Sequence, residues 1–392
     1  MGAETQHHTL EQFFGTAIVQ NKAVAAWRLP LTEQVQACIS LQQNITTNQP
    51  NLEQSPFGFL FCPFNITEQE HQLFIKADLY FDAATGSMTT TADAPAEAAQ
   101  NFTAALQSIN QPTSNWHSSA TNQASYQTEL GFKGAVEKAI AAITSEEMEK
   151  VVLSRNYSEK LPANFSPVAA FEAMLQAYPN AFVSLVSVPG VGTWMGVSPE
   201  VLVSINEEQI FKTVALAGTQ PAVEKVGDAI WRQKEIEEQG MVERYILSCF
   251  KSLRLREYTE VGPRTVIAGN LMHLRTDFKV DLKEVDFPTL GTDMLRLLHP
   301  TSAVCGLPKE PALQFILSHE GYNRSYYSGY LGPVNSPAGT HIFVNLRCMQ
   351  VRDQEIILYA GAGITGESNP EKEWQETQHK MQTMRRILVN FE

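Results

Sequence analysis

The sequence lacks the features that mark several broad classes of protein. Its five cysteines are scattered, with no CxxC pair, so neither a disulfide framework nor a thiolate metal site is indicated. No apolar run approaches the roughly 18 residues of a membrane span. The first residues contain neither a basic nor an apolar segment typical of a secretion signal. We therefore expect a cytoplasmic protein with reduced thiols and no membrane partner.

Positive charge is also in short supply. The 392 residues carry 29 Lys and Arg against 42 Asp and Glu, a formal net charge of -13. We expect no nucleic-acid partner, because nucleic acids attract basic surfaces. A small anionic ligand is compatible with the sequence, provided that a few cations and backbone N–H groups gather locally. With 43% hydrophobic residues, the chain can bury a large core.

What the sequence does contain is a series of short apolar segments and amphipathic helices. The stretch 181–217 has the apolar runs and turn residues of β-hairpins. Strands are also expected at 57–64, 73–81, 150–155, 341–351 and 355–364. Helical spacing predicts helices at 91–109, with Asp93 as its cap, and at 132–143, 166–180, 224–254 and 370–388. Hairpins with helices outside them predict an α+β fold with large, mostly antiparallel sheets flanked by helices.

A glycine-rich segment, AGAGITG at 360–366, follows one of these strands and precedes the last helix. If it forms a loop, its backbone N–H groups could make a nest for an anion. A plain strand-to-helix connection would have the same sequence. The motifs of P-loops, zinc proteases, EF-hands and serine hydrolases are absent from the sequence.

Two of the predicted helices carry glutamates at the same spacing. Glu235 and Glu238 lie three apart in one helix, and Glu373 and Glu376 lie three apart in the last helix. Residues three or four apart share a helix face. Two such faces turned toward each other could supply oxygen ligands to Mg²⁺. Solvent-exposed acidic faces, offset by nearby Lys and Arg, fit the spacing as well.

Three single residues stand out by their surroundings. Lys150 opens an apolar segment, where partial desolvation favours the neutral amine. Glu200 lies between apolar residues, and a carboxyl in such surroundings can serve as a general acid. Taken singly, surface positions are the commoner outcome for both. Arg347 lies inside an apolar segment and needs a carboxylate partner, either a ligand or a structural ion pair.

Together, several segments resemble the chorismate-utilising enzymes, most closely the isochorismate synthases of that family. The resemblance covers about residues 128 to 390. It is carried by KVVLSR (150–155), GVSPEVLVS (196–204), ALAGT (215–219), HPTSAVCGLP (299–308), LRCMQV (346–351), LYAGAGITGESNPEKEWQET (358–377) and Lys380. It implies a single body like anthranilate synthase component I. In that body 128–392 is the chorismate-binding catalytic region and 1–127 is a variable N-terminal part of the same fold.

The resemblance also implies a role for each candidate residue. Lys150 matches the base that activates water for attack on C2 of chorismate, and Glu200 matches the acid that protonates the departing C4 hydroxyl. The implied ligands of a Mg²⁺ cofactor are Glu238 and Glu376, supported by Glu235 and Glu373. The implied contacts to the substrate come from Gly218, Thr219, His273, Ala303, Arg347, Gly361, Gly363 and Lys380.

Within the family, the nucleophile determines the product. Relatives that add an amino group tend to carry Gln at the position of Lys150, and the aminodeoxychorismate type carries Lys at that of Ala217. The resemblance therefore implies water as nucleophile and an isomerase that makes isochorismate. Ala303 favours stopping there, and the alternatives are a salicylate synthase, which goes on to eliminate pyruvate, and a non-catalytic chorismate-binding subunit. One departure is Gln239, where the family's metal-helix motif often has His.

The product feeds two pathways in this family. Menaquinone biosynthesis is our expectation, and supply of a catechol siderophore is the alternative. The resemblance also implies a monomer whose partner is the small molecule chorismate.

Overall fold

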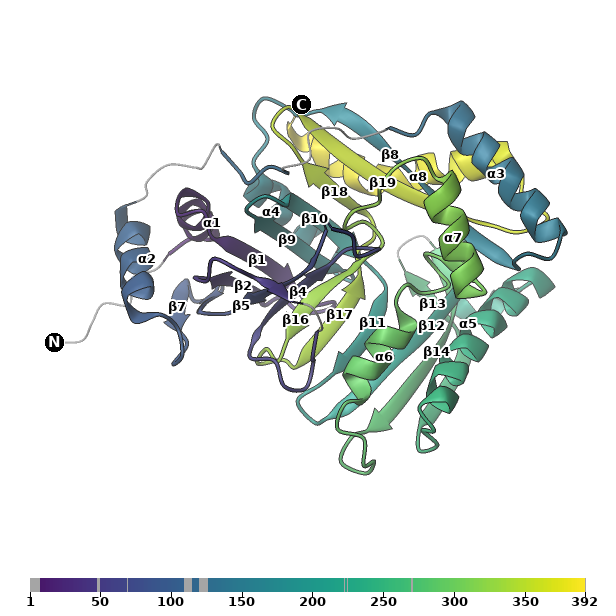
Figure 1. Ribbon diagram of the computed structural model, residues 1–392, viewed down its shortest axis with the longest axis horizontal. Coiled ribbons are helices and arrows are strands. Elements are labelled where there is room, and N and C mark those ends of the chain that lie inside the picture. Colours follow the sequence, from purple (N-terminus) through teal and green to yellow (C-terminus); the bar gives the residue numbers. More distant parts are fainter. Residues whose placement is uncertain are drawn as a thin grey trace.

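The computed structural model describes residues 8–47, 50–68, 70–108, 115–119, 126–221, 223, 225–268 and 271–391. Within them the chain forms two large sheets flanked by helices (Figure 1). The ladders between neighbouring strands of both sheets are antiparallel. The predicted α+β architecture is therefore confirmed.

The first sheet has ten strands in the described part of the chain. In spatial order they are β15 (Gly306–Leu307), β8 (Lys150–Lys160), β19 (Glu355–Ile364), β18 (Cys348–Val351), β10 (Gly192–Ser198), β9 (Phe182–Val188), β1 (Ala23–Arg28), β2 (Val35–Ser40), β6 (Leu79–Asp82) and β7 (Ser87–Thr90). Strands from the N-terminal third thus continue the sheet that the rest of the chain begins, with β1 paired to β9.

The second sheet has nine strands in the same described ranges. In spatial order they are β13 (Thr259–Ala268), β14 (Leu271–Asp281), β12 (Ile210–Pro221), β11 (Val201–Ile205), β17 (Thr340–Val344), β16 (Tyr330–Val334), β4 (Gly58–Cys62), β5 (Gln72–Lys76) and β3 (Thr46–Thr47). Here too the N-terminal strands, purple in Figure 1, pair with strands from late in the chain, since β4 pairs with β16.

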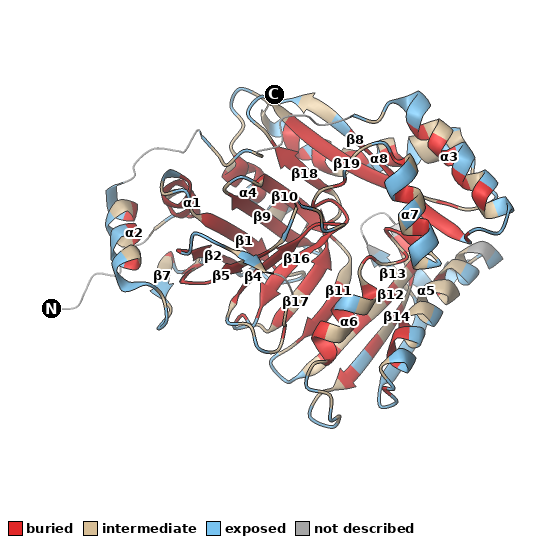
Figure 2. Cartoon of the chain, in the orientation of Figure 1, coloured by how far each residue is buried: buried red, intermediate tan, exposed pale blue. Residues whose placement is uncertain are grey.

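Helices cover the outer faces of both sheets. They are α1 (Leu10–Val19), α2 (Ala96–Ser108), α3 (Glu129–Thr144), α4 (Pro167–Ala177), α5 (Gln233–Ser252), α6 (Leu290–Leu298), α7 (Lys309–His319) and α8 (Pro370–Leu388), with short 3₁₀ turns η1 (Val226–Asp228) and η2 (Val389–Phe391). Their buried sides face the strands, most of which are buried, whereas the edge strands β7 and β13 are more exposed (Figure 2). No described helix is long and apolar enough to cross a membrane.

Aromatic side chains fill the space between the sheets. Phe182 of β9 stacks on Phe343 of β17 with ring centroids 4.1 Å apart. Trp194 of β10 meets Phe61 of β4 edge-on at 6.3 Å. Each contact joins one sheet to the other, and these rings belong to one continuous buried cluster. Large rings buried in this way contribute much of the apolar area that stabilises a fold.

Two segments predicted as single strands are each divided between the sheets. Residues 341–351 form β17 in the second sheet and β18 in the first, with Arg347 at a φ of 46° between them. Residues 73–81 likewise divide into β5 and β6. At that second break the buried Asp78 accepts from the N–H of Leu41 at 2.8 Å and pairs with Lys76 at 3.0 Å. At this crossing a polar side chain therefore takes up a backbone donor from the neighbouring segment.

Two helix starts differ from the sequence-based expectation. The helix predicted over 224–254 begins at Gln233, because the Glu235 carboxylate accepts from the N–H of Arg232 at 2.9 Å and so satisfies a free donor there. The helix predicted over 91–109 begins at Ala96. Its expected cap, Asp93, instead pairs with Lys76 at 2.7 Å. The last helix, at 370–388, has the predicted bounds.

A buried ion pair joins β8 to the loop that follows α6. Glu320 and Arg324 are 2.6 Å apart, and both side chains are 2% exposed. The Glu320 carboxylate also accepts from the N–H and the hydroxyl of Ser154, at 2.6 and 2.8 Å. Arg324 donates to the carbonyl oxygens of Val152 and Val304, both at 2.7 Å. The pair therefore holds a strand and a distant loop in one fixed relation.

Arg324→Met is expected to lower the free energy of unfolding by about 3–5 kcal/mol, because it leaves the Glu320 carboxylate buried without its counter-charge. Arg296→Met is the matched control, since Arg296 pairs with Asp293 at the surface, where such pairs contribute at most about 1 kcal/mol. Urea unfolding followed by circular dichroism measures both. Equal losses in the two variants would contradict this account.

Candidate active site

Lys150, the first residue of β8, is 7% exposed. Its Nζ lies 2.9 Å from Oε1 of Glu238 on α5. A Cβ on Gly363 of β19 would lie 3.1 Å from the Cε of Lys150, so the missing side chain at Gly363 makes room for the lysine. The structure thus brings together three of the residues that the sequence singled out, from three separate elements.

The predicted strand at 355–364 is confirmed as β19, so the glycine-rich segment is strand as far as Ile364 and the anion nest that a loop would have made is not formed. Gly361 and Gly363 lie opposite Ser154 and Val152 of β8. The N–H groups of Ser154 and Val152 point away from β19, because they donate to Glu320 and to the Cys305 carbonyl. Opposed residues in an antiparallel pair exchange both hydrogen bonds or neither. The N–H and C=O groups of both glycines therefore face the other edge of β19.

That edge lies beyond the end of the neighbouring strand, because the pairing of β18 with β19 ends at Leu358. Lys380 of α8 lies at this edge and donates its Nζ to the Gly361 carbonyl at 2.8 Å. The same Nζ pairs with Glu376 at 2.8 Å, and both side chains are about half exposed. Two backbone N–H groups and one ammonium thus gather along one strand edge, an arrangement suited to a carboxylate.

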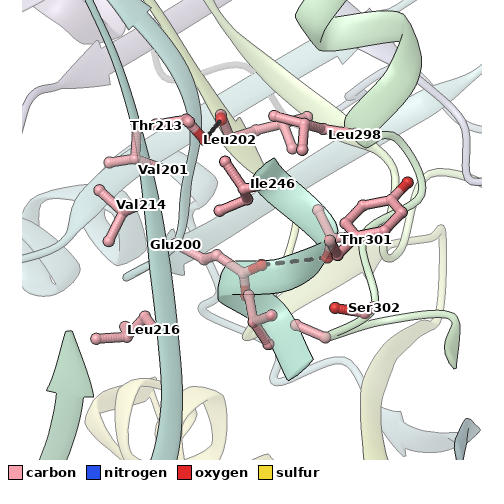
Figure 3. A pocket seen from close by; sticks show the side chains of 13 residues that line it. Glu200, Val201, Leu202, Thr213, Val214, Leu216, Ile246, Leu298, Thr301 and Ser302 are labelled. Atoms are coloured by element: carbon pink, nitrogen blue, oxygen red, sulfur yellow. Dashed lines mark hydrogen bonds between the residues drawn. The ribbon is translucent and has the colours of Figure 1, made fainter. Parts of the chain in front are cut away.

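Glu200 lies between β10 and β11, and its backbone is held from two sides. Its N–H donates to the Ser198 hydroxyl at 3.3 Å, and its carbonyl accepts from the N–H of Val344 at 3.0 Å. The carboxyl lines a cavity of about 30 Å³ whose walls are mostly aliphatic, and Ala303 lies in the same wall (Figure 3).

This cavity determines how Glu200 titrates. Burial raises the pKa of its carboxyl to about 7, since desolvation penalises the ionised form. A hydrogen bond from Thr301 and the charges of Lys150, Arg347 and Lys380 act in the opposite direction, and burial outweighs them. A carboxyl with such a pKa is available as an acid near neutral pH.

Arg347 lies where the chain leaves one sheet for the other, not inside a strand as the sequence suggested. Burial lowers the pKa of its guanidinium, while Tyr178 and Glu200 favour the charged form. Within the described ranges its guanidinium makes no ion pair. Of the two partners considered for it, a ligand and a structural carboxylate, the geometry favours the ligand.

A bulge in β12 brings Gly218 against α5. Its φ is +63°, the register of β12 with β14 shifts at this point, and an added Cβ would lie 3.1 Å from Cβ of Glu235. Both the backbone conformation and the close approach require glycine. Thr219 follows, but its side chain lies outside the described part of the structure. His273 lies opposite Thr219 on β14, and burial lowers the pKa of its imidazole.

The four helix glutamates occupy different positions around these residues. Glu235 caps the start of α5, Glu238 pairs with Lys150, and Glu376 pairs with Lys380. Glu373 is partly buried on α8. Among the described residues, no three Asp, Glu, His or Cys side chains are grouped so as to hold an ion. Carboxylate oxygens are suitable ligands for a hard cation such as Mg²⁺. Glu238 and Glu376 pair with Lys150 and Lys380, and both of these lysines lie against β19.

Gln239, which the sequence marked only as a departure from a motif, is 1% exposed and fully engaged. Its Oε1 accepts from the N–H of Ala217 at 2.9 Å. Its Nε2 lies within hydrogen-bond distance of Ala215 O, Glu243 Oε1 and Thr276 Oγ1. The amide therefore fastens α5 to β12 one residue before the bulge. The only signal for this role in the sequence was that Gln239 follows Glu238 directly and stands where the family's metal-helix motif often has His.

The fold and the site define the class of protein, an enzyme whose charged side chains gather at strand ends between two large antiparallel sheets. The chain belongs to the chorismate-binding enzymes, because the family model described as "Chorismate binding enzyme" matches residues 4–389. The predicted family is thereby confirmed.

Individual relatives agree with this assignment. The isochorismate synthase MenF of Escherichia coli K12 is 28% identical over 296 residues, 74% of this chain and 67% of that protein. The isochorismate synthase DhbC of Bacillus subtilis 168 is 28% identical over 271 residues, 66% of this chain and 67% of that protein. The solved structure of Escherichia coli MenF, at 21% identity, covers 96% of this chain and 91% of its own with a TM-score of 0.77, which shows the shared fold.

Gln239→Leu is expected to lower the free energy of unfolding by about 2–4 kcal/mol, because it leaves the Ala217 N–H and its other polar neighbours buried without a partner. Gln233→Leu makes the same change at the exposed start of α5 and is expected to cost no more than about 0.5 kcal/mol. Urea unfolding compares the two. A loss in Gln239→Leu as small as in the control would show that the amide does not fasten the helix.

Proposed function

We propose that this protein is an isochorismate synthase, an isomerase that converts chorismate to isochorismate. The observation that carries the proposal is the buried Lys150 within electrostatic reach of Glu200, whose carboxyl has a pKa raised to about 7. Adding water at one carbon and expelling a hydroxyl from another needs a base and an acid that work near neutral pH. Family membership and the names of the relatives support the same activity.

The substrate carries two carboxylates, and the chain has a net charge of -13, so cations must be concentrated locally. We assign Arg347, Lys380 and the N–H groups of Gly361 and Gly363 to the enolpyruvyl carboxylate. A guanidinium can bind a carboxylate through two parallel hydrogen bonds. The remaining contacts to chorismate are assigned to Gly218, Thr219, His273 and Ala303.

In the proposed reaction, Lys150 first gives up the proton that it holds in its ion pair with Glu238, and its amine then takes a proton from water as the water oxygen bonds to C2. The ring double bonds shift, the C4–O bond breaks, and Glu200 gives its proton to the departing oxygen. One water enters and one leaves, so substrate and product are isomers. Lys150 ends protonated and Glu200 ionised, and proton exchange with solvent restores both for the next turnover.

We assign Glu238 and Glu376 as the residues that would hold a Mg²⁺ ion, with Glu235 and Glu373 as supports. When bound, the ion would supply positive charge that offsets the ring carboxylate. Holding it would require Glu238 and Glu376 to exchange their present lysine partners.

By resemblance to the family, Lys150 together with Ala217 supports water as the nucleophile, and Ala303 supports release at isochorismate. We place the product in menaquinone biosynthesis, because MenF, whose solved structure is described as that of the menaquinone-specific isochorismate synthase, aligns with a larger share of this chain than DhbC does. Supply of a catechol siderophore is the alternative. We further propose a cytoplasmic monomer in which 128–392 is the catalytic region and 1–127 is the variable part of the same fold.

Purified protein given chorismate and Mg²⁺ is expected to form isochorismate, identified by liquid chromatography and mass spectrometry. Lys150→Ala should lower kcat by at least about 100-fold, because it removes the base. Lys133→Ala, which removes a lysine that pairs with surface glutamates on α3 and α8, is the control and should retain full turnover. Excess EDTA should stop the reaction and added Mg²⁺ restore it.

Each alternative gives a different result in this assay. Salicylate formed without a separate lyase would make the protein a salicylate synthase. Absence of any product would leave it a chorismate-binding subunit. Undiminished turnover in EDTA would remove the metal from the proposal and leave the acid–base pair in place.

The pH dependence of kcat/KM tests the role of Glu200. Its pKa is raised, so the proton needed for catalysis is present below pH about 7 and is lost as the pH rises through that value. We expect kcat/KM to fall on the alkaline side with a limb near pH 7. Glu200→Gln keeps the shape of the side chain, but its amide cannot transfer a proton to the departing hydroxyl. The kcat of this variant should therefore fall at least about 100-fold. A wild-type profile that stays level well above pH 7 would contradict the assignment.

A further inference from the structure

Thr301 is the residue whose side chain touches the proposed acid. Its Oγ1 donates to Oε1 of Glu200 at 3.3 Å, across 101 positions of sequence (Figure 3). Thr301 lies in the loop between α6 and β15, and its carbonyl accepts from the N–H groups of Val304 and Cys305 at 3.1 and 2.9 Å. Arg324 holds the same loop through the Val304 carbonyl. The backbone around the hydroxyl is thus fixed before any ligand binds.

None of the other hydroxyls in the cavity wall forms a hydrogen bond with Glu200 in the described structure. Thr213 donates to the carbonyl of Leu202 at 2.8 Å, and Tyr245 donates to that of Leu297 at 2.7 Å. The Ser302 hydroxyl is buried and has no hydrogen-bond partner in the described structure. The rest of the lining is aliphatic apart from the acid itself. Within the described residues, Thr301 is therefore the one lining side chain that donates a hydrogen bond to the carboxyl of Glu200.

The direction of that hydrogen bond determines where the acid proton resides. When the hydroxyl donates to Oε1 of the neutral carboxyl, this oxygen is the acceptor and the acid proton resides on Oε2. The charged groups that face Glu200 are Lys150, Arg347 and Lys380, and they act on it through space. In the described structure none of them forms a hydrogen bond with the carboxyl, so Thr301 alone distinguishes its two oxygens.

We propose that Thr301 is a positioning residue for the acid: it holds Oε1 as an acceptor, so that Oε2 presents the proton to the departing hydroxyl. The inference rests on the proposed isochorismate synthase activity. Thr301 transfers no proton itself, and its role is that of the carboxylate that orients the imidazole in a hydrolase triad. A threonine that only completed the cavity wall would leave the titration of Glu200 unchanged.

The test compares Thr301→Val, which removes the hydroxyl at nearly constant shape, with Thr301→Ser, which keeps it. In Thr301→Val we expect kcat to fall about tenfold and KM to change less than about twofold. Because the ionised Glu200 carboxylate loses the hydrogen bond from Thr301, the alkaline limb of the kcat/KM profile should also move upward by about one pH unit. Thr301→Ser should recover most of the activity and the wild-type limb. Thr213→Val, the control from the same wall, should keep both the wild-type kcat and the wild-type limb.

A second readout needs no turnover. Carbon-13 NMR of glutamate-labelled protein, with the Glu200 signal identified by its absence in Glu200→Gln, follows the titration of this carboxyl directly. Thr301→Val should raise its midpoint, and Thr301→Ser should not. An unchanged midpoint in Thr301→Val, or an equal shift in Thr213→Val, would overturn the inference. If the wild type makes no isochorismate, the proposed function fails, and the NMR titration still decides the role of Thr301.

Discussion

The buried ion pair of Glu320 and Arg324 is the interaction on which the geometry of the site depends. It bonds to β8 two and four residues after Lys150, and to the loop three residues after Thr301. Removing either partner would leave a charge uncompensated away from water, so the pair is costly to open. The ion pair therefore fixes the position of the proposed base, Lys150, relative to Thr301, which contacts the proposed acid. The ion pair itself takes no part in the chemistry.

Near this ion pair, two of the three cationic side chains of the site are neutralised by glutamates. Lys150 is paired with Glu238 of α5 and Lys380 with Glu376 of its own helix α8, whereas Arg347 has no ion-pair partner in the described structure. The two glycines of β19 contribute N–H groups along the same edge as Lys380. A ligand with carboxylates would thus find the guanidinium of Arg347 and the ammonium of Lys380. A bound cation could replace Lys150 and Lys380 as the partner of Glu238 and Glu376. A strongly acidic chain can in this way offer a local site for an anion.

Local signals made part of this structure predictable. The closing helix has the predicted bounds because Asn369 caps it, Pro370 opens it and its apolar residues recur at helical spacing. Lys150, Glu238 and Gly363, named from family resemblance, do lie in contact. What the sequence could not show depends on distant pairing. Residues 341–351 divide between sheets only because each half has a different neighbour. The bonds of Gln239, Thr301 and Arg324 join residues from separate elements, which no local pattern records.

The central claim is that this chain adds water to C2 of chorismate while the C4 hydroxyl leaves. The most direct measurement is turnover in water enriched in oxygen-18, followed by mass spectrometry of the product and its fragments. The account predicts isochorismate with one labelled oxygen, located at C2, and no label at that position in the Lys150→Ala reaction over the same time. Isochorismate that forms without label would contradict water as the nucleophile and, with it, the roles assigned to Lys150 and Glu200.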